Sequence, residues 1–129
     1  MSQRLNILIA EDNATNRLIL SELLKTDHDL EFCDNGKAAV EAAKRGGIDV
    51  ILMDVHMPIL NGLEATAAIR AVGNDVPIIA LTADKEFAET PTALDCGLNG
   101  IILKPITVHE LFAAIAHYVP ACDRSRDRR

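Results

Sequence analysis

Three carboxylates, one hydroxyl and one ammonium stand directly after four short apolar segments of the chain. In chain order they are Glu11, Asp12, Asp54, Thr82 and Lys104. If the apolar segments are parallel strands, their carboxyl ends share one edge of a sheet, and ligands bind just outside that edge. We therefore expect these five side chains to meet around a common point.

Carboxylates that meet in this way repel one another. Two unit charges about 4 Å apart repel by roughly 4 kcal/mol at an effective dielectric constant of about 20, so either one carboxylate keeps its proton or a cation neutralises the group. Oxygen ligands favour a hard divalent ion, and Mg²⁺ is the usual one beside a phosphoryl group. A carboxylate such as Asp54 can attack phosphorus and form an acyl phosphate. Thr82 and Lys104 suit the added oxygens.

The segments that must position these side chains alternate between strand and helix patterns. The nearly all-apolar run before Asp54 is typical of a strand buried on both faces of a parallel sheet. Strands are predicted at residues 5–10, 30–33, 49–53, 76–81 and 101–103, and helices around 18–24, 37–44, 63–71, 91–97 and 108–118. The second strand is short and mixed in polarity, which fits a sheet edge. Five such alternations predict an α/β fold, a doubly wound three-layer sandwich around a parallel sheet.

Residues 83–96 hold conflicting signals. Pro91 would break the interior of a helix, but Thr90 can cap a helix whose first residue is Pro91. We therefore expect a loop up to Pro91 and a helix from there to Gly97.

Two other predicted helices suggest how they pack and where they begin. The helix over residues 63–71 is expected to pack through Leu63, Ala67 and residues 69–71. The last helix has Thr107 in front of it and Glu110 three residues on, which is a capping-box pattern.

Composition bounds the class of protein. The chain has 129 residues, of which 49% are hydrophobic, enough for one compact domain; we expect it over residues 1–120, with 121–129 as a disordered, Arg-rich tail. A net charge of -6 argues against nucleic-acid binding. The first apolar run stops at Glu11, too short for a signal peptide or membrane span. Three cysteines without a CxxC motif predict reduced thiols and a cytoplasmic location.

Taken together, the motifs resemble those of the response-regulator receiver domain, the CheY-like family, over residues 4–119. They are Glu11-Asp12, then Asp54-Val55-His56-Met57-Pro58 followed by Asn61-Gly62, then Thr82-Ala83, then Lys104-Pro105. A single motif of this kind would be weak, but all four occur in order. The segments around residues 11–13 and 61–65 resemble receivers attached to hybrid histidine kinases, and also fit a single-domain relay protein.

The resemblance implies a role for each site residue. Asp54 would be the phosphoacceptor, and Thr82 and Lys104 would bind the phosphoryl oxygens. Asp12 and Asp54 would bind Mg²⁺ directly with the backbone carbonyl of His56, while Glu11 would act mainly through water. It also implies a sheet order of 2-1-3-4-5 and a Lys104–Pro105 bond that is often cis.

The resemblance further implies a phosphorelay function. A histidine kinase or histidine phosphotransfer protein would donate the phosphoryl group, and the phosphorylated form would switch conformation to control a downstream protein. The domain would be no enzyme apart from catalysing its own phosphorylation and dephosphorylation. No nucleic acid or membrane insertion is expected, and phosphorylation-dependent dimerisation stays open.

Two features depart from this pattern or extend it. Ile101 stands where many receivers have Tyr or Phe, so the aromatic rotation that reports phosphorylation in those members is not available here. This and the Arg-rich tail motivate the alternative, a non-phosphorylated binding module for a partner protein or an anionic ligand such as a nucleotide. An aspartyl-phosphate hydrolase is disfavoured because His56 stands where those enzymes usually carry a second aspartate.

Overall fold

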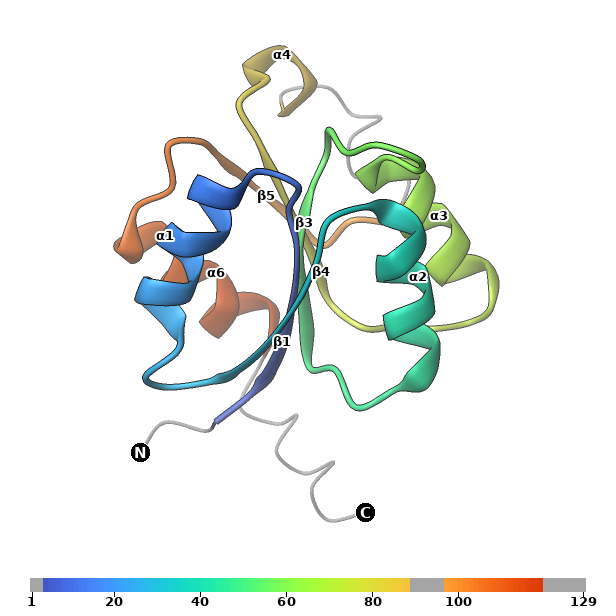
Figure 1. Ribbon diagram of the computed structural model, residues 1–129, viewed down its shortest axis with the longest axis horizontal. Coiled ribbons are helices and arrows are strands. Elements are labelled where there is room, and N and C mark those ends of the chain that lie inside the picture. The colour runs from blue at the N-terminus through green and yellow to red at the C-terminus, as the bar shows by residue number, and fades with distance from the viewer. Residues whose placement is uncertain (1–3, 89–96, 120–129) are drawn as a thin grey trace.

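The chain forms one parallel sheet with helices on both faces (Figure 1). This computed structural model describes residues 4–88 and 97–119. The strands are β1 (Asn6–Ala10), β2 (Asp29–Cys33), β3 (Val50–Asp54), β4 (Ile78–Thr82) and β5 (Gly100–Leu103). Their order is β2-β1-β3-β4-β5, and every neighbouring pair is parallel. The predicted fold class and the implied sheet order are confirmed.

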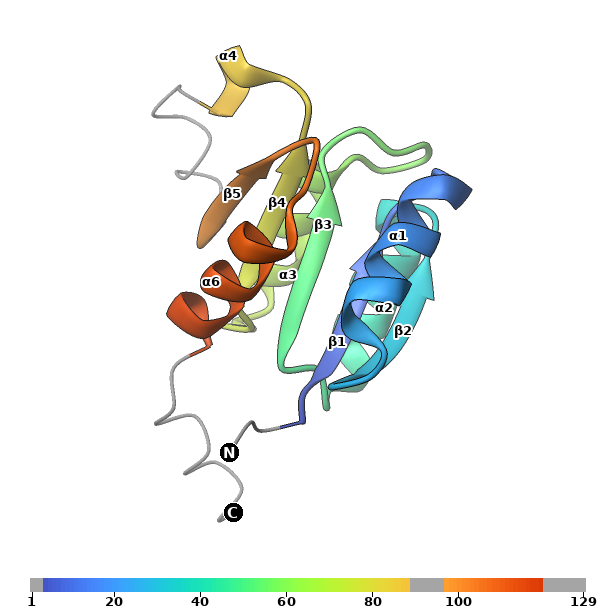
Figure 2. The same ribbon diagram turned by 90° about the vertical axis from the view of Figure 1, so that its left-hand side faces the viewer.

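The helices divide into two layers. α1 (Ala14–Leu24) and α6 (Val108–Tyr118) cover one face of the sheet, and α2 (Gly36–Arg45) and α3 (Gly62–Ala71) cover the other, as the edge-on view in Figure 2 shows. Because all neighbouring strands are parallel, their carboxyl ends lie together at one end of the sheet. β1 starts and α6 ends at the opposite end (Figure 1).

Alternating strand side chains feed two separate apolar layers. Ile7 and Ile9 pack with α1 and α6, whereas Leu8 and Ala10 pack with α2 and α3. All residues of β3 and β4 are buried, which explains why their sequences carry no alternation. β2 is half exposed at the sheet edge, as its short sequence of mixed polarity predicted.

Polar caps fix where two helices begin. Asn61 accepts the Glu64 N–H at 2.8 Å while Glu64 accepts the Asn61 N–H at 3.0 Å, a complete capping box in front of α3. Thr107 accepts the Glu110 N–H at 3.2 Å, but Glu110 binds the Thr107 hydroxyl instead of its N–H. The predicted cap of α6 is therefore present, with a different return bond.

The packed face of α3 differs in part from the prediction: Leu63 and Ile69 pack as expected, but other predicted positions do not. Ala65, Thr66 and Ile69 are buried, whereas Ala67 and Ala71 are exposed. Four of the ten residues of α3 are alanines, and alanine is small enough to occupy either face. The sequence pattern of such a helix does not define one apolar stripe.

The expected loop before Pro91 is also wrong in part, because it contains the short helix α4 (Lys85–Ala88). The carboxylate of Asp84 accepts the Phe87 N–H at 3.0 Å and starts this single turn. The helix predicted from Pro91 and the tail over 121–129 lie outside the described residues. Among the helices of the described ranges, none has the length and apolar character needed to span a membrane.

Candidate functional site

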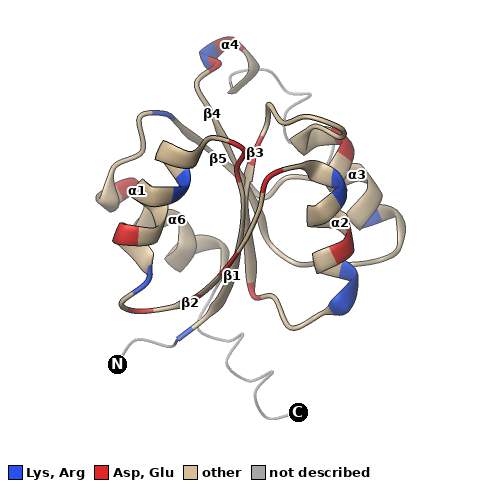
Figure 3. Ribbon diagram, in the orientation of Figure 1, with Lys and Arg blue, Asp and Glu red and all other residues tan. Residues whose placement is uncertain are grey.

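The polar residues predicted from the strand ends lie at one edge of the sheet. Asp54 is the last residue of β3 and Thr82 the last of β4, while Glu11 and Lys104 directly follow β1 and β5. The strand register places Asp54 beside Leu81, one residue before Thr82. Figure 3 shows the acidic positions after β1 and at the end of β3 gathered at this edge.

Three carboxylates meet there. One oxygen each from Glu11, Asp12 and Asp54 lies within 4.8 Å of the others. Glu11 is fully buried and Asp54 is 5% exposed, whereas Asp12 faces solvent. The predicted acid trio therefore exists, with one open side.

Lys104 supplies a positive charge to this trio. Its Nζ donates to Glu11 Oε1 at 3.1 Å and lies 3.5 Å from Asp54 Oδ2. The ammonium is mostly buried, with 19% of its side chain exposed, so the ion pairs are only weakly screened. The Lys104–Pro105 peptide bond is cis, as the resemblance implied.

The ionisation of Asp54 responds to this crowding. Burial and then the neighbouring Glu11 carboxylate raise the pKa of Asp54 from 3.8 to about 6. The His56 N–H, which donates to Asp54 Oδ1 at 3.2 Å, and Lys104 pull that pKa the other way. The net direction of the pKa shift is upward because burial and the Glu11 carboxylate outweigh the His56 N–H and Lys104.

Thr82 and His56 also lie beside the trio. Thr82 is fully buried, and its hydroxyl accepts the Asp84 N–H at 3.0 Å. Its carbonyl accepts the Lys104 N–H at 2.8 Å, which ties the ends of β4 and β5 together. The His56 side chain is exposed, so its contact with the site is through the backbone.

The start of α2 is joined through its backbone to the loop that follows Asp54. The Gly36 N–H donates to the Leu60 carbonyl at 2.9 Å. A Cβ at Gly36 would lie 2.0 Å from that oxygen, so only glycine fits there. Ile59, beside Leu60, has a φ of 71° and is 75% exposed, which is a strained conformation for a β-branched residue.

Sequence reasoning missed two residues that hold the β1–α1 turn. The Asn13 N–H donates to Glu11 Oε2 at 3.3 Å, and Asn13 also caps α1. Arg17, one turn into α1, donates from Nη1 to the Glu11 carbonyl at 2.8 Å. The Asn13 cap could have been found from its position before a helix, but a bond to a backbone carbonyl leaves no signal in residue types.

The donor set fits a hard divalent cation. The ligand atoms offered are all carboxylate oxygens, and Asp12 is open to solvent, so bound water could complete the coordination. Three carboxylates meet here and Lys104 contacts two of them, so the group carries excess negative charge. A divalent ion would neutralise it.

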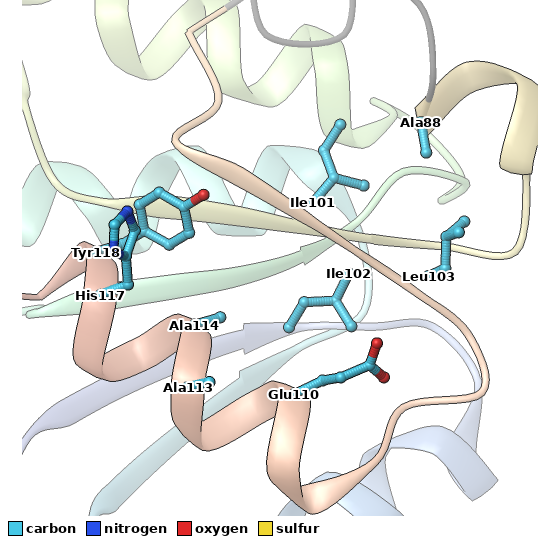
Figure 4. Close-up of a pocket in the computed structure, with 9 residues that line it drawn as sticks. All are labelled: Ala88, Ile101, Ile102, Leu103, Glu110, Ala113, Ala114, His117 and Tyr118. Carbon is cyan, nitrogen blue, oxygen red and sulfur yellow. The ribbon is translucent and has the colours of Figure 1, made fainter.

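A hollow of about 540 Å³ lies away from the trio, between β5 and α6. Ile101 and Leu103 project from one face of β5 and Ile102 from the other (Figure 4). The Tyr118 ring lies against Gly100, where an added Cβ would meet it at 2.4 Å. Ile101 thus lines this hollow at the position where many receivers carry an aromatic ring.

The fold and the acid trio define a receiver-type domain, and comparison with known proteins gives the family. The family model for the response regulator receiver domain matches residues 7–116. The chain therefore belongs to the response regulator receiver domain family.

Curated relatives of this chain include a histidine kinase and a sensor protein. Probable histidine kinase 5 of Oryza sativa subsp. japonica is 34% identical over 90% of this chain, and the sensor protein EvgS of Escherichia coli (strain K12) is 32% identical over 93%. The chain spans only 12% and 11% of the length of these two relatives.

Two solved receiver domains resemble the chain over nearly their whole length. The receiver domain of the sensor histidine kinase PA1611 from Pseudomonas aeruginosa PAO1 is 34% identical with a TM-score of 0.81, covering 91% of this chain and 98% of that one. Its structure has a magnesium ion coordinated in the active site cleft. The receiver domain of Ssk1 from Saccharomyces cerevisiae, solved with the histidine phosphotransfer protein Ypd1, is 32% identical with a TM-score of 0.84, covering 92% and 91%.

Proposed function

We propose that this chain is a phosphoacceptor receiver that takes a phosphoryl group from a phosphohistidine onto Asp54. The observation that carries the proposal is the contact of one ammonium, on Lys104, with both Glu11 and Asp54 at the edge where the three carboxylates meet. Such an arrangement can hold charge as it develops on transferred oxygens.

Each site residue has a role in this proposal. Asp54 is the nucleophile, and Lys104 and the Thr82 hydroxyl bind the phosphoryl oxygens. Asp12, Asp54 and the His56 carbonyl would hold Mg²⁺, with Glu11 beside them. When bound, the ion supplies positive charge that neutralises the carboxylates and the phosphoryl oxygens. The magnesium reported for the related PA1611 receiver supports this assignment.

The transfer can be written with this chain's own groups. A carboxylate oxygen of Asp54 forms a bond to phosphorus while the phosphorus–nitrogen bond of the donor breaks, and the imidazole nitrogen leaves with that electron pair. The Lys104 ammonium then loses part of its contact with Asp54 and donates to the oxygens of the transferred phosphoryl group. Later attack by water at phosphorus restores the carboxylate and releases inorganic phosphate. The domain in this way catalyses only its own phosphorylation and dephosphorylation.

The donor is a histidine kinase or a histidine phosphotransfer protein, and a downstream protein reads the phosphorylated state. The complex of the related Ssk1 receiver with Ypd1 supports the first part. We place the reaction in the cytoplasm, as the cysteines predict; Cys33 carries a free thiol, and burial raises its pKa to about 11. Residues 1–120 would form the phosphoaccepting domain.

Intact-mass measurement after incubation with acetyl phosphate and Mg²⁺ tests the proposal. The wild-type protein should gain the mass of one phosphoryl group, and chelation of the metal should abolish the gain. Asp54→Asn should gain nothing, because an amide nitrogen or oxygen is a poor nucleophile at phosphorus.

A matched control separates loss of the acceptor from loss of charge. Asp75→Asn removes the same charge at an exposed loop position before β4 and should be phosphorylated like the wild type. An equal mass gain in Asp54→Asn, or none in the wild type, would contradict the proposal.

A further inference from the structure

Glu11 is held by its backbone as well as by its side chain. Its N–H donates to the Cys33 carbonyl at 3.0 Å, which extends the pairing of β1 with β2 by one residue. Its own carbonyl accepts Nη1 of Arg17 at 2.8 Å. Because a peptide unit is planar, the second bond fixes the plane from which the chain enters Asp12.

Asp12 depends on this backbone support. Its carboxylate is exposed, and no hydrogen bond or ion pair formed by the described residues holds it. Glu11 and Asp54, by contrast, are both buried and both contact Lys104. The backbone position from which the Asp12 side chain starts is therefore set by the Glu11–Asp12 peptide.

The hydrogen bond from Arg17 to this peptide would favour metal binding, whereas the positive charge of Arg17 would oppose it. The ion pairs found among the described residues do not include Arg17. An arginine cation near a divalent-cation site opposes metal binding by repulsion. A role in orienting Asp12 and a role through charge thus predict opposite effects when Arg17 is removed.

We propose that Arg17 is a positioning residue for the divalent-cation site, orienting the Glu11–Asp12 peptide and through it the Asp12 carboxylate. The inference rests on the proposed function, because the cation site is part of it. Residues that orient a metal ligand through a hydrogen bond, without contacting the metal, typically change metal affinity by roughly 10–100-fold.

Titration of the full chain with free Mn²⁺, followed by electron paramagnetic resonance, tests the inference without any phosphoryl transfer. Arg17→Met removes the donor and the charge while keeping the length of the side chain, and should weaken Mn²⁺ binding by roughly tenfold. Arg17→Lys keeps a donor that reaches the carbonyl and should bind within about threefold of the wild type, as expected for retained hydrogen bonding.

Lys25→Met serves as the matched control, because it removes one positive charge from the end of the same helix at an exposed ion pair. Its affinity for Mn²⁺ should equal that of the wild type or rise slightly. Thermal melting without metal accompanies each titration, and the Arg17 variants should melt close to the wild type. If Arg17→Met does not fold, Arg17→Ala carries the same expectation.

Three results would overturn the inference. Unchanged affinity in a folded Arg17→Met would show that the bond to Glu11 is not needed, and tighter binding would show that Arg17 acts through its charge. Both leave the proposed function intact, because the wild type still binds the ion. A wild type that binds no Mn²⁺ would remove the proposed cation site and this inference together.

Discussion

At the scale of single residues, the site balances three carboxylates against one ammonium. Lys104 contacts both buried carboxylates, so the free energy of ionising Asp54 and the stability of the fold depend on the same side chain. Such coupling is expected where charges share a water-poor environment.

Replacing Lys104 should reveal this dependence. Lys104→Met leaves the buried Glu11 carboxylate without its cation and should lower the free energy of unfolding by about 1–3 kcal/mol, the usual cost of an unpaired buried group. Urea unfolding of the metal-free protein measures the change. The exposed pair of Lys25 with Glu22 provides the comparison: Lys25→Met should cost less than about 0.5 kcal/mol, and equal losses would argue against the coupling.

The raised pKa of Asp54 predicts a pH dependence of stability. The pKa of Asp54 in the folded protein is about 6, above its ordinary value of 3.8, so folding favours the protonated form. This contribution is complete below about pH 3.8 and is lost as the pH rises through about 6. The metal-free protein should therefore lose about 1–3 kcal/mol from this group between pH 4 and pH 8.

Urea unfolding in the presence of a chelator at several pH values measures the effect. Asp54→Asn cannot ionise and should flatten this part of the profile, becoming more stable than the wild type near pH 8. Added Mg²⁺ should stabilise the wild type at pH 8 more than at pH 5, because the bound ion requires the deprotonated carboxylate. A variant that keeps the wild-type slope would contradict the assignment to Asp54.

At the scale of elements, the loop between β3 and α3 is strained at Ile59. A β-branched residue with a φ of 71° costs about 1–2 kcal/mol, and the side chain is 75% exposed, so packing returns little. Ile59→Gly should raise the free energy of unfolding by about 0.5–1 kcal/mol, after the entropy of glycine in the unfolded chain is subtracted.

Val72 gives a matched control for the glycine entropy. It is 64% exposed with a φ of -97°, a conformation that any residue adopts. Val72→Gly should therefore lower stability where Ile59→Gly raises it. Thermal melting of both variants would decide the point, and a loss in Ile59→Gly would mean that the loop conformation depends on the isoleucine side chain.

The contact between Gly36, at the start of α2, and the β3–α3 loop is equally testable. Gly36→Ala would place a Cβ 2.0 Å from the Leu60 carbonyl oxygen, so the β3–α3 loop must shift or the fold must weaken. We expect a loss of more than about 2 kcal/mol, together with slower acyl-phosphate formation because the loop carries the residues after Asp54. Urea unfolding measures the loss of stability, and intact-mass time courses measure the rate of acyl-phosphate formation. A variant with unchanged stability and rate would show that the β3–α3 loop does not depend on its contact with Gly36.

At the scale of the whole molecule, the sequence predicted what depends on residue type at strand ends. Glu11, Asp54 and Lys104 could be assigned to one edge because parallel strands end together. The packed face of α3 could not be fully predicted, because alanines carry no strong pattern. The helix α4 could not be predicted because its single turn is too short to show a period. The role of Arg17 could not be predicted because it contacts a backbone carbonyl.

The end of the sheet opposite Asp54 is suited to attaching labels. β1 begins there, and α6 ends there with Tyr118 against Gly100 at the start of β5 (Figure 1). β3 has five residues and ends at Asp54, so its start lies roughly 13 Å of extended chain away from Asp54. Fluorescent reporters or surface tethers joined before β1 or after α6 would thus be attached remote from the acceptor, leaving it accessible for watching single turnovers.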